Sequence, residues 1–149
     1  MTSPTGSPEG VRDPMAEPPR PRITVINDNP EFLELMAAIL DEDAGYDVSL
    51  FDGEHASVDA IAATDPNLVI VDLVLGGASG WDVVALARAD GRLADRPILV
   101  CSADVAGLRG RRDELERIGN VHALEKPFTI DQITEVVERL VGKASPTTG

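Results

Sequence analysis

The stretch Leu68-Val69-Ile70-Val71-Asp72 places four consecutive apolar residues directly before a carboxylate. A strand that is apolar on every residue is covered on both faces, which is typical of a parallel sheet with helices on either side. A second stretch, Pro97-Ile98-Leu99-Val100-Cys101, has the same character and is followed by Ser102. The sequence therefore predicts a parallel sheet with these two strands in its interior.

Outward from these two stretches, strand-like and helix-like segments alternate along the chain. The helical segments carry apolar residues three or four positions apart, as Phe32, Leu35 and Met36 do. The predicted strands cover residues 23–26, 46–51, 68–71, 97–101 and 121–124, and the predicted helices cover residues 31–40, 56–63, 81–89, 104–118 and 129–141. The helix over 104–118 is the weakest, because Gly107 and Gly110 each cost it about 1 kcal/mol relative to Ala.

Repeated β-then-α units of this kind favour a doubly wound sheet with right-handed crossovers. The predicted fold class is α/β: a five-stranded parallel doubly wound (βα)5 sheet, flavodoxin-like, with strand order 2-1-3-4-5. In such sheets the functional crevice lies at the carboxyl ends of the strands. Candidate site residues are therefore sought where strands end.

Composition predicts one domain between two short tails. Residues 1–21 contain six prolines and almost no large apolar side chain, so we expect a disordered tail there, the domain over 22–142, and a second disordered tail over 143–149. No run is long and apolar enough to cross a bilayer. No segment resembles a signal peptide, and the single Cys101 excludes an internal disulfide framework. These features predict a cytoplasmic protein that does not enter the membrane.

The charge is unevenly distributed along the chain. The net charge is −13, and residues 23–87 hold 13 Asp and Glu but no Lys or Arg. An acidic surface repels phosphate backbones, which argues against direct nucleic-acid binding. It favours a cation or a basic partner protein, although a surface of this kind also serves solubility alone.

Polar residues stand at the predicted carboxyl ends of several strands. Asn27 and Asp28 follow the first strand, Asp72 and Ser102 follow the two buried strands, and Lys126 lies just beyond the last. Together they suit phosphoryl transfer onto a carboxylate, with Asp72 as the nucleophile. A divalent cation between Asp28 and Asp72 would offset the crowded negative charge, and oxygen ligands favour Mg²⁺ as that cation. Lys126 and Ser102 suit the oxygens of the transferred group.

These residues, in this order and spacing, resemble the receiver domain of response regulators from two-component signalling. The resemblance covers residues 22–142. It rests on Asn27-Asp28, on Val71-Asp72-Leu73 with Gly80 eight positions after Asp72, on Ser102-Ala103, and on Glu125-Lys126-Pro127-Phe128. It implies that Asp72 accepts the phosphoryl group from a histidine kinase or phosphotransfer protein.

The resemblance also implies roles for other positions. Asp28, Asp72 and the backbone carbonyl of Val74 would hold magnesium, with Asn27 as a further candidate. Ser102 would be the hydroxyl switch and Lys126 the lysine that contacts the phosphoryl group. Gly80 and Pro127 would be structural, and the bond before Pro127 is similar to one that is often cis in this family.

Four positions depart from the family pattern. Asn27 stands where the first of two acids is usual, which should weaken magnesium binding, and the same amide is equally suited to a simple Asx turn. Gly76 and Gly77 replace a usual proline, and Ala123 replaces the usual switch aromatic. The chemistry of the acceptor site is therefore largely present, whereas the output relay is altered.

Two functions follow as hypotheses. The first is a stand-alone phospho-accepting receiver that signals through contacts with a downstream protein, with homodimerisation left open. The second is a receiver-like interaction module that works without phosphorylation, which Asn27, Gly76 and Ala123 motivate. A phosphatase of the aspartyl-phosphate type is rejected, because it needs a second acid where the chain has Val74.

Overall fold

Five parallel strands form one sheet in the computed structural model, which describes residues 20–53, 56–75, 78–103 and 105–142. The strand order is β2-β1-β3-β6-β7, which is the predicted order 2-1-3-4-5 and confirms the fold class. The strands are β1 (Arg22–Ile26), β2 (Asp47–Phe51), β3 (Leu68–Asp72), β6 (Ile98–Ser102) and β7 (Val121–Glu125).

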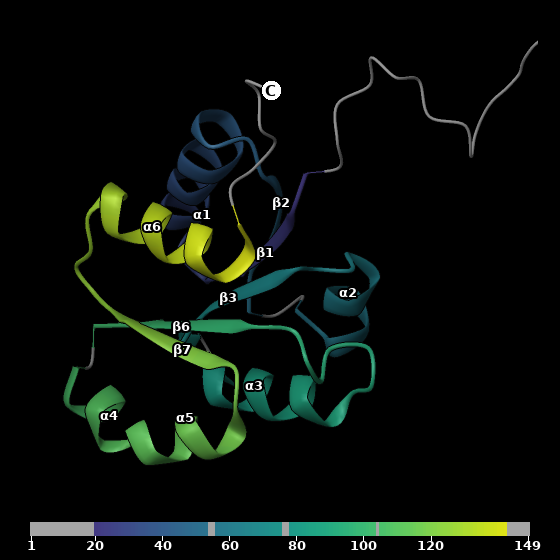
Figure 1. Ribbon diagram of the computed structural model, residues 1–149, viewed down its shortest axis with the longest axis vertical. Coiled ribbons are helices and arrows are strands. Elements are labelled where there is room, and N and C mark those ends of the chain that lie inside the picture. Colours follow the sequence, from purple (N-terminus) through teal and green to yellow (C-terminus); the bar gives the residue numbers. More distant parts are fainter. Residues whose placement is uncertain (1–19, 54–55, 76–77, 104, 143–149) are drawn as a thin grey trace, which may run out of the picture.

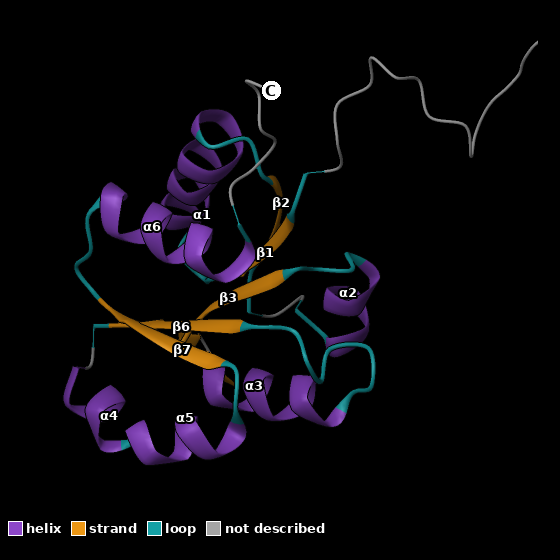
Figure 2. Cartoon of the chain, in the orientation of Figure 1, coloured by secondary structure: helices purple, strands orange, loops and turns teal. Residues whose placement is uncertain are grey.

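Helices cover both faces of this sheet (Figures 1 and 2). One face carries α1 (Pro30–Met36), its continuation η1 (Ala37–Asp43) and α6 (Ile130–Val141). The other face carries α2 (Val58–Ala63), α3 (Gly80–Ala89), α4 (Val105–Gly110) and α5 (Arg112–Ile118). The molecule is therefore three layers deep, with β3 and β6 in the interior of the middle layer.

The core consists of two hydrophobic clusters, one on each face of the sheet. Every residue of β3 and of β6 is buried, as the unbroken apolar runs predict. Because successive side chains of a strand point to opposite faces, Leu68 and Ile70 pack toward α1 and α6. Val69 and Val71 pack toward the helices of the opposite face. This two-sided burial fixes where β3 ends and therefore where Asp72 lies.

Local signals place the helix starts next to the strand ends. Asn29 caps α1 and accepts a hydrogen bond from the Glu31 backbone N–H at 2.9 Å. Pro30 begins the helix, where a missing N–H costs nothing. Thr129 and Gln132 form a reciprocal capping box at the start of α6.

Three elements differ from the predictions. The first helix is longer than residues 31–40, because α1 passes into a π-helix that ends at Asp43 and buries Ile39 and Leu40. The helix expected over 104–118 is two helices that meet at Arg111, directly after Gly110. Beyond β3 the chain forms a small antiparallel hairpin of β4 (Val74–Leu75) and β5 (Ala78–Ser79), which no strand prediction covered.

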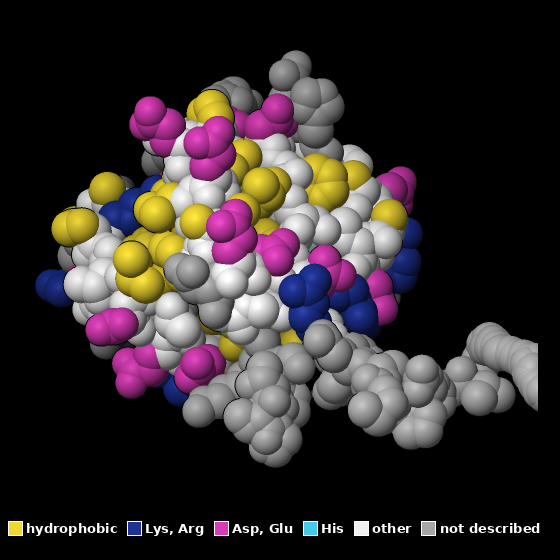
Figure 3. Space-filling model, turned by 90° about the horizontal axis from the view of Figure 1, so that it is seen from above, with side chains coloured by type: hydrophobic (Ala, Val, Ile, Leu, Met, Phe, Trp, Pro, Cys, Tyr) yellow, Lys and Arg dark blue, Asp and Glu magenta, His cyan; other side chains and the backbone are white. Residues whose placement is uncertain are grey.

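Gly76 and Gly77, where the resemblance leads us to expect a proline, lie outside the described residues, as do the tail residues 1–19 and 143–149. Of the part of the chain that the structure describes, no helix combines the length and apolar content needed to cross a bilayer. Acidic side chains are spread over the face that Figure 3 shows, with hydrophobic side chains exposed among them.

Candidate functional site

Three side chains from three strand ends meet at the carboxyl end of the sheet. Asp72, the last residue of β3, is only 9% exposed. The Lys126 ammonium, which follows β7, contacts Asp72 Oδ2 as a hydrogen bond and ion pair. Asn27, directly after β1, donates from Nδ2 to the same Oδ2 at 3.0 Å. The structure therefore brings together the predicted acceptor, the predicted lysine and the candidate amide.

The amide of Asn27 is held at both ends. Asn27 is 4% exposed, and its Oδ1 accepts a hydrogen bond from the Asn29 backbone N–H at 2.8 Å. This contact is the Asx turn that the sequence analysis kept as an alternative role. Its backbone N–H donates to the Phe51 carbonyl at 3.0 Å, which anchors the turn to β2. Only the NH₂ group of an amide donates, so Nδ2 is the end that faces the Asp72 carboxylate.

Lys126 rests on an aromatic platform that the sequence analysis missed. Its Nζ lies 4.7 Å from the ring centroid of Phe32, which belongs to α1. Phe32 in turn contacts Phe128 edge to face, with ring centroids 6.2 Å apart and an interplanar angle of 78°. The Lys126–Pro127 peptide is cis. The available signal was an aromatic residue one helical turn after Asp28, but it was read only as part of the apolar face of the helix.

Asp28 and Ser102 lie at the same end of the sheet. Asp28 is exposed, and its Oδ1 accepts a hydrogen bond from the Gly53 backbone N–H at 2.6 Å. Ser102 is 1% exposed at the end of β6, and its carbonyl accepts from the Lys126 backbone N–H at 2.9 Å. The Asp28 contact ties the first strand end to the loop after β2, and the Ser102 contact positions the backbone of Lys126.

Gly80 allows the backbone after Asp72 to fold back closely. Its N–H donates to the Leu73 carbonyl at 2.9 Å, and a Cβ at this position would lie 2.8 Å from Leu73 Cα and closer still to the Asp72 carbonyl oxygen. Real Cβ atoms essentially never approach other heavy atoms so closely. Glycine is therefore required where α3 begins beside the site.

The donor atoms at this end suit a hard divalent cation that keeps several of its waters. Asp28 and Asp72 offer carboxylate oxygens, and Val74, whose carbonyl is the third predicted ligand, lies two residues beyond Asp72 in β4. Oxygen ligands in small number are what Mg²⁺ uses. Across the described ranges no group of three or more His, Cys, Asp or Glu forms a denser metal cage.

The Cys101 thiol is unreactive, although Cys101 lies opposite Asp72 in the register of β3 and β6. Burial raises the pKa of its thiol to about 12. The thiolate is the nucleophilic and metal-binding form of cysteine, so Cys101 stays a protonated core side chain.

The face of β7 near α4 is hollow where the resemblance predicts an aromatic. Ala123 is exposed, and a cavity of about 90 Å³ beside it is lined by Leu108 and Leu115. Arg109 and Glu125 line the same cavity and form an ion pair at 3.1 Å. Where the resemblance leads us to expect an aromatic side chain, the structure has a small cavity bordered by an exposed ion pair.

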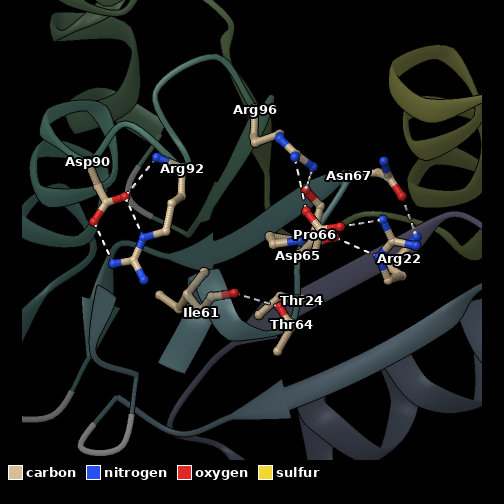
Figure 4. Close-up of polar contacts among 10 residues, drawn as sticks. All are labelled: Arg22, Thr24, Ile61, Thr64, Asp65, Pro66, Asn67, Asp90, Arg92 and Arg96. Atoms are coloured by element: carbon tan, nitrogen blue, oxygen red, sulfur yellow. Dashed lines mark hydrogen bonds and ion pairs between the residues drawn. The ribbon is translucent and has the colours of Figure 1, made fainter. Parts of the chain in front are cut away.

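The amino end of the sheet carries a different polar network, shown in Figure 4. Asp65 Oδ2 accepts from Arg22 Nη2 at 2.9 Å, and Asp65 Oδ1 accepts from Arg96 Nη2 at 3.0 Å. Asn67 Oδ1 accepts from the Arg22 backbone N–H at 2.8 Å. These contacts join the starts of β1, β3 and β6, and no sequence-predicted site residue takes part.

Comparisons with known proteins agree with the fold. The sequence profile of the response regulator receiver domain matches residues 23–138. Transcriptional regulatory protein FixJ from Bradyrhizobium diazoefficiens is 30% identical over 129 residues, which cover 83% of this chain and 58% of FixJ. The chain spans about half the length of the curated relatives it matches.

Solved structures align over most of their length. A sensor protein from Polaromonas sp. JS666 is 26% identical with a TM-score of 0.73, covering 83% of this chain and 97% of that one. The response regulator TrrA from Thermotoga maritima, solved in complex with Mg²⁺ and BeF, is 26% identical with a TM-score of 0.66 and covers 80% of this chain and 98% of its own. On the profile match, the strand order and these relatives, the chain belongs to the family of response regulator receiver domains.

Proposed function

We propose that this protein accepts a phosphoryl group on Asp72 from a histidine kinase or phosphotransfer protein, in a reaction that uses Mg²⁺. The observation that carries the proposal is the burial of the Asp72 carboxylate against the Lys126 ammonium at the end of the central strand. Burying a charge is costly unless it is paired, so a paired charge at this place indicates a functional role.

The proposed transfer uses groups from this site, Mg²⁺ and a phosphoryl donor. A carboxylate oxygen of Asp72 forms a bond to phosphorus, and the bond between phosphorus and the donor's imidazole nitrogen breaks. The bonding electron pair leaves with the nitrogen, so the product is an acyl phosphate on Asp72. Lys126 binds a phosphoryl oxygen, and its ammonium balances charge that builds up there.

The cation would be held by Asp28, Asp72 and the Val74 carbonyl. Mg²⁺ bound there would offset negative charge on the transferring group. Asn27 orients the Asp72 carboxylate through its 3.0 Å hydrogen bond, and the Phe32 ring contacts the Lys126 ammonium. Ser102 offers a hydroxyl at the neighbouring strand end for the phosphoryl group once it is attached.

Phosphorylation is proposed to act by shifting an equilibrium between two arrangements of the loops around Ser102 and α4. The signal passes to a downstream protein through surface contacts. Because Ala123 replaces the aromatic expected from the resemblance, this shift proceeds without a ring that rotates inward.

The test is intact-mass measurement after incubation with acetyl phosphate and magnesium. We expect an added mass of one phosphoryl group in the wild-type protein, and none in Asp72→Asn. The variant keeps the volume of the side chain and one acceptor oxygen but removes the nucleophilic carboxylate. The absence of an adduct, or an adduct that persists in Asp72→Asn, contradicts the proposal.

A second candidate function is an interaction module that works without phosphorylation. The exposed Ala123 and the hollow beside it favour this function, because the relay predicted for this position is missing. Binding partners recovered equally by wild-type protein and by Asp72→Asn would support it. Partners that require the phosphorylated form would exclude it.

A further inference from the structure

Asn27 presents a hydrogen-bond donor to the acceptor carboxylate, at a position where the resemblance predicts an acid. Its Nδ2 and the Lys126 ammonium both contact Asp72 Oδ2. A carboxylate at position 27 accepts hydrogen bonds and cannot donate them, so it would face Asp72 as a second negative charge. The substitution of amide for acid therefore reverses the interaction from repulsion to attraction.

The surrounding backbone fixes this orientation of the amide. Oδ1 of Asn27 receives the Asn29 N–H at 2.8 Å, so turning the amide over would place its NH₂ group against that donor and its oxygen against the Asp72 carboxylate. Asn27 is 4% exposed, and unsatisfied polar atoms at such depth are strongly disfavoured. The backbone thus holds the Asn27 amide with its NH₂ group directed at the Asp72 carboxylate.

The amide also lowers the charge that a cation must offset. Asp28, Asp72 and Lys126 together carry one net negative charge, and an acid at position 27 would make it two. Like charges at hydrogen-bond distance in a buried setting repel strongly. With Asn27, the carboxylate of Asp72 has its ammonium and amide partners before any cation arrives.

We infer that Asn27 is a positioning residue that assembles the acceptor site without magnesium, so that the conformational stability of this protein is nearly independent of the cation. The inference rests on the proposed function, because it assigns magnesium a role in phosphoryl transfer and no role in assembling the site. It concerns the free site, however, and is measured without any phosphoryl donor.

The experiment is thermal unfolding of the full chain in EDTA and in millimolar magnesium, for wild type and Asn27→Asp. We expect the wild-type melting temperature to move by less than about 1 °C between the two conditions. We expect Asn27→Asp to melt about 5 °C lower than wild type in EDTA and to regain most of that difference in magnesium. Magnesium titration followed through Trp81 fluorescence should show about tenfold tighter binding in the variant, because ligand charge sets affinity.

Asn67→Asp is the matched control. It makes the same amide-to-acid change at the amino end of the sheet, where Oδ1 only accepts a hydrogen bond from the Arg22 N–H, which an acid also accepts. We expect its melting temperature to show no dependence on magnesium. Asn27→Ala removes the donor without adding charge, and it should slow labelling by acetyl phosphate while leaving the melting temperature independent of magnesium.

A wild-type melting temperature that rises with magnesium as much as that of Asn27→Asp overturns the inference. So does an Asn27→Asp variant that is as stable as wild type in EDTA. If acetyl phosphate fails to label the protein while Asn27→Asp becomes magnesium-dependent, the proposed function fails and the role of Asn27 stands. The two failures are therefore distinguishable.

Discussion

At the amino end of the sheet Asp65 lies between Arg22 and Arg96, whereas at the carboxyl end Asp72 lies against Lys126 and Asn27 (Figure 4 shows the amino end). Both ends thus pair a carboxylate with cationic groups. The side chain of Asp65 is 61% exposed, and that of Asp72 is 11% exposed. An aspartate paired with a cationic side chain is therefore exposed to solvent at one end of the sheet and buried at the other.

Exposure decides what each cluster contributes. Exposed ion pairs are worth about 0–1 kcal/mol because water solvates the separated charges nearly as well. At the amino end the ion pairs of Asp65 connect the loop before β3 to the starts of β1 and β6, which is a structural role. A buried carboxylate is costly to keep, and apolar residues of similar volume are often no less stable. The buried pair at the carboxyl end is the one that the proposed function uses.

The largest difference between the two ends is expected for glycine replacement. Gly80→Ala places a Cβ against the backbone of Asp72 and Leu73, so we expect a loss of about 3 kcal/mol in the free energy of unfolding. Gly91→Ala, after α3 at the amino end, meets nothing within 4 Å and should change stability by less than about 0.5 kcal/mol. Urea denaturation of both variants measures the difference. Equal losses would show that Gly80 has room to relax.

The next effect separates the two cation clusters by function. Lys126→Met removes the ammonium from Asp72, and we expect the rate of labelling by acetyl phosphate to fall about a hundredfold. Arg96→Met removes a cation from Asp65 and should leave the labelling rate unchanged, with a stability loss of about 1 kcal/mol or less. Intact-mass time courses give both rates. A Lys126→Met variant labelled at the wild-type rate would remove Lys126 from the transfer step.

A smaller effect tests the aromatic platform under Lys126. Phe32→Leu keeps an apolar side chain but removes the ring 4.7 Å from the ammonium. A cation–π contact at a partly exposed site is worth about 0.5–1 kcal/mol. We therefore expect labelling to slow about two- to fivefold. Phe128→Leu removes the edge-to-face contact and leaves the Phe32 ring in place, so its labelling rate should stay closer to wild type.

The smallest effect concerns pH and a residue of β7, the strand that Lys126 follows. Burial, together with the positive charges of Arg139 and Arg88, lowers the pKa of His122 from its ordinary value. The unfolded chain therefore binds a proton more readily than the folded chain as pH falls below about 6.5, and stability decreases in that range. His122→Gln should lose less stability than wild type between neutral and mildly acidic pH. Urea midpoints across this range compare the two proteins, and parallel curves would exclude His122.

Much of the fold followed from local pattern. The apolar runs at Leu68 and Ile98 predicted interior strands because only two-sided burial explains them, and the structure confirms this. The break at Gly110 and the π-helix after Met36 did not follow. Both depend on how a helix meets the core, which the spacing of apolar residues along the chain does not specify.

The site residues were found in the sequence because parallel strands end at the same side of a sheet. Their types and order alone singled out Asp28, Asp72, Ser102 and Lys126 as candidates. Their assigned roles stay predictions until labelling is measured. Phe32 was missed because an aromatic residue on an amphipathic helix usually packs in the core. The sequence around Phe32 does not show that its ring contacts the ammonium of Lys126, which lies 94 positions later in the chain.

The sequence by itself determined the order of elements, the two buried strands and the set of polar strand ends, because hydrophobic periodicity and residue type are local properties. Only the tertiary structure decided that the Asn27 amide presents its nitrogen to Asp72 and that Asp28 contacts Gly53. Hydrogen-bond direction depends on which groups from distant segments surround a side chain. That environment exists only once β1, β3 and β7 have joined one sheet, in which β6 lies between β3 and β7.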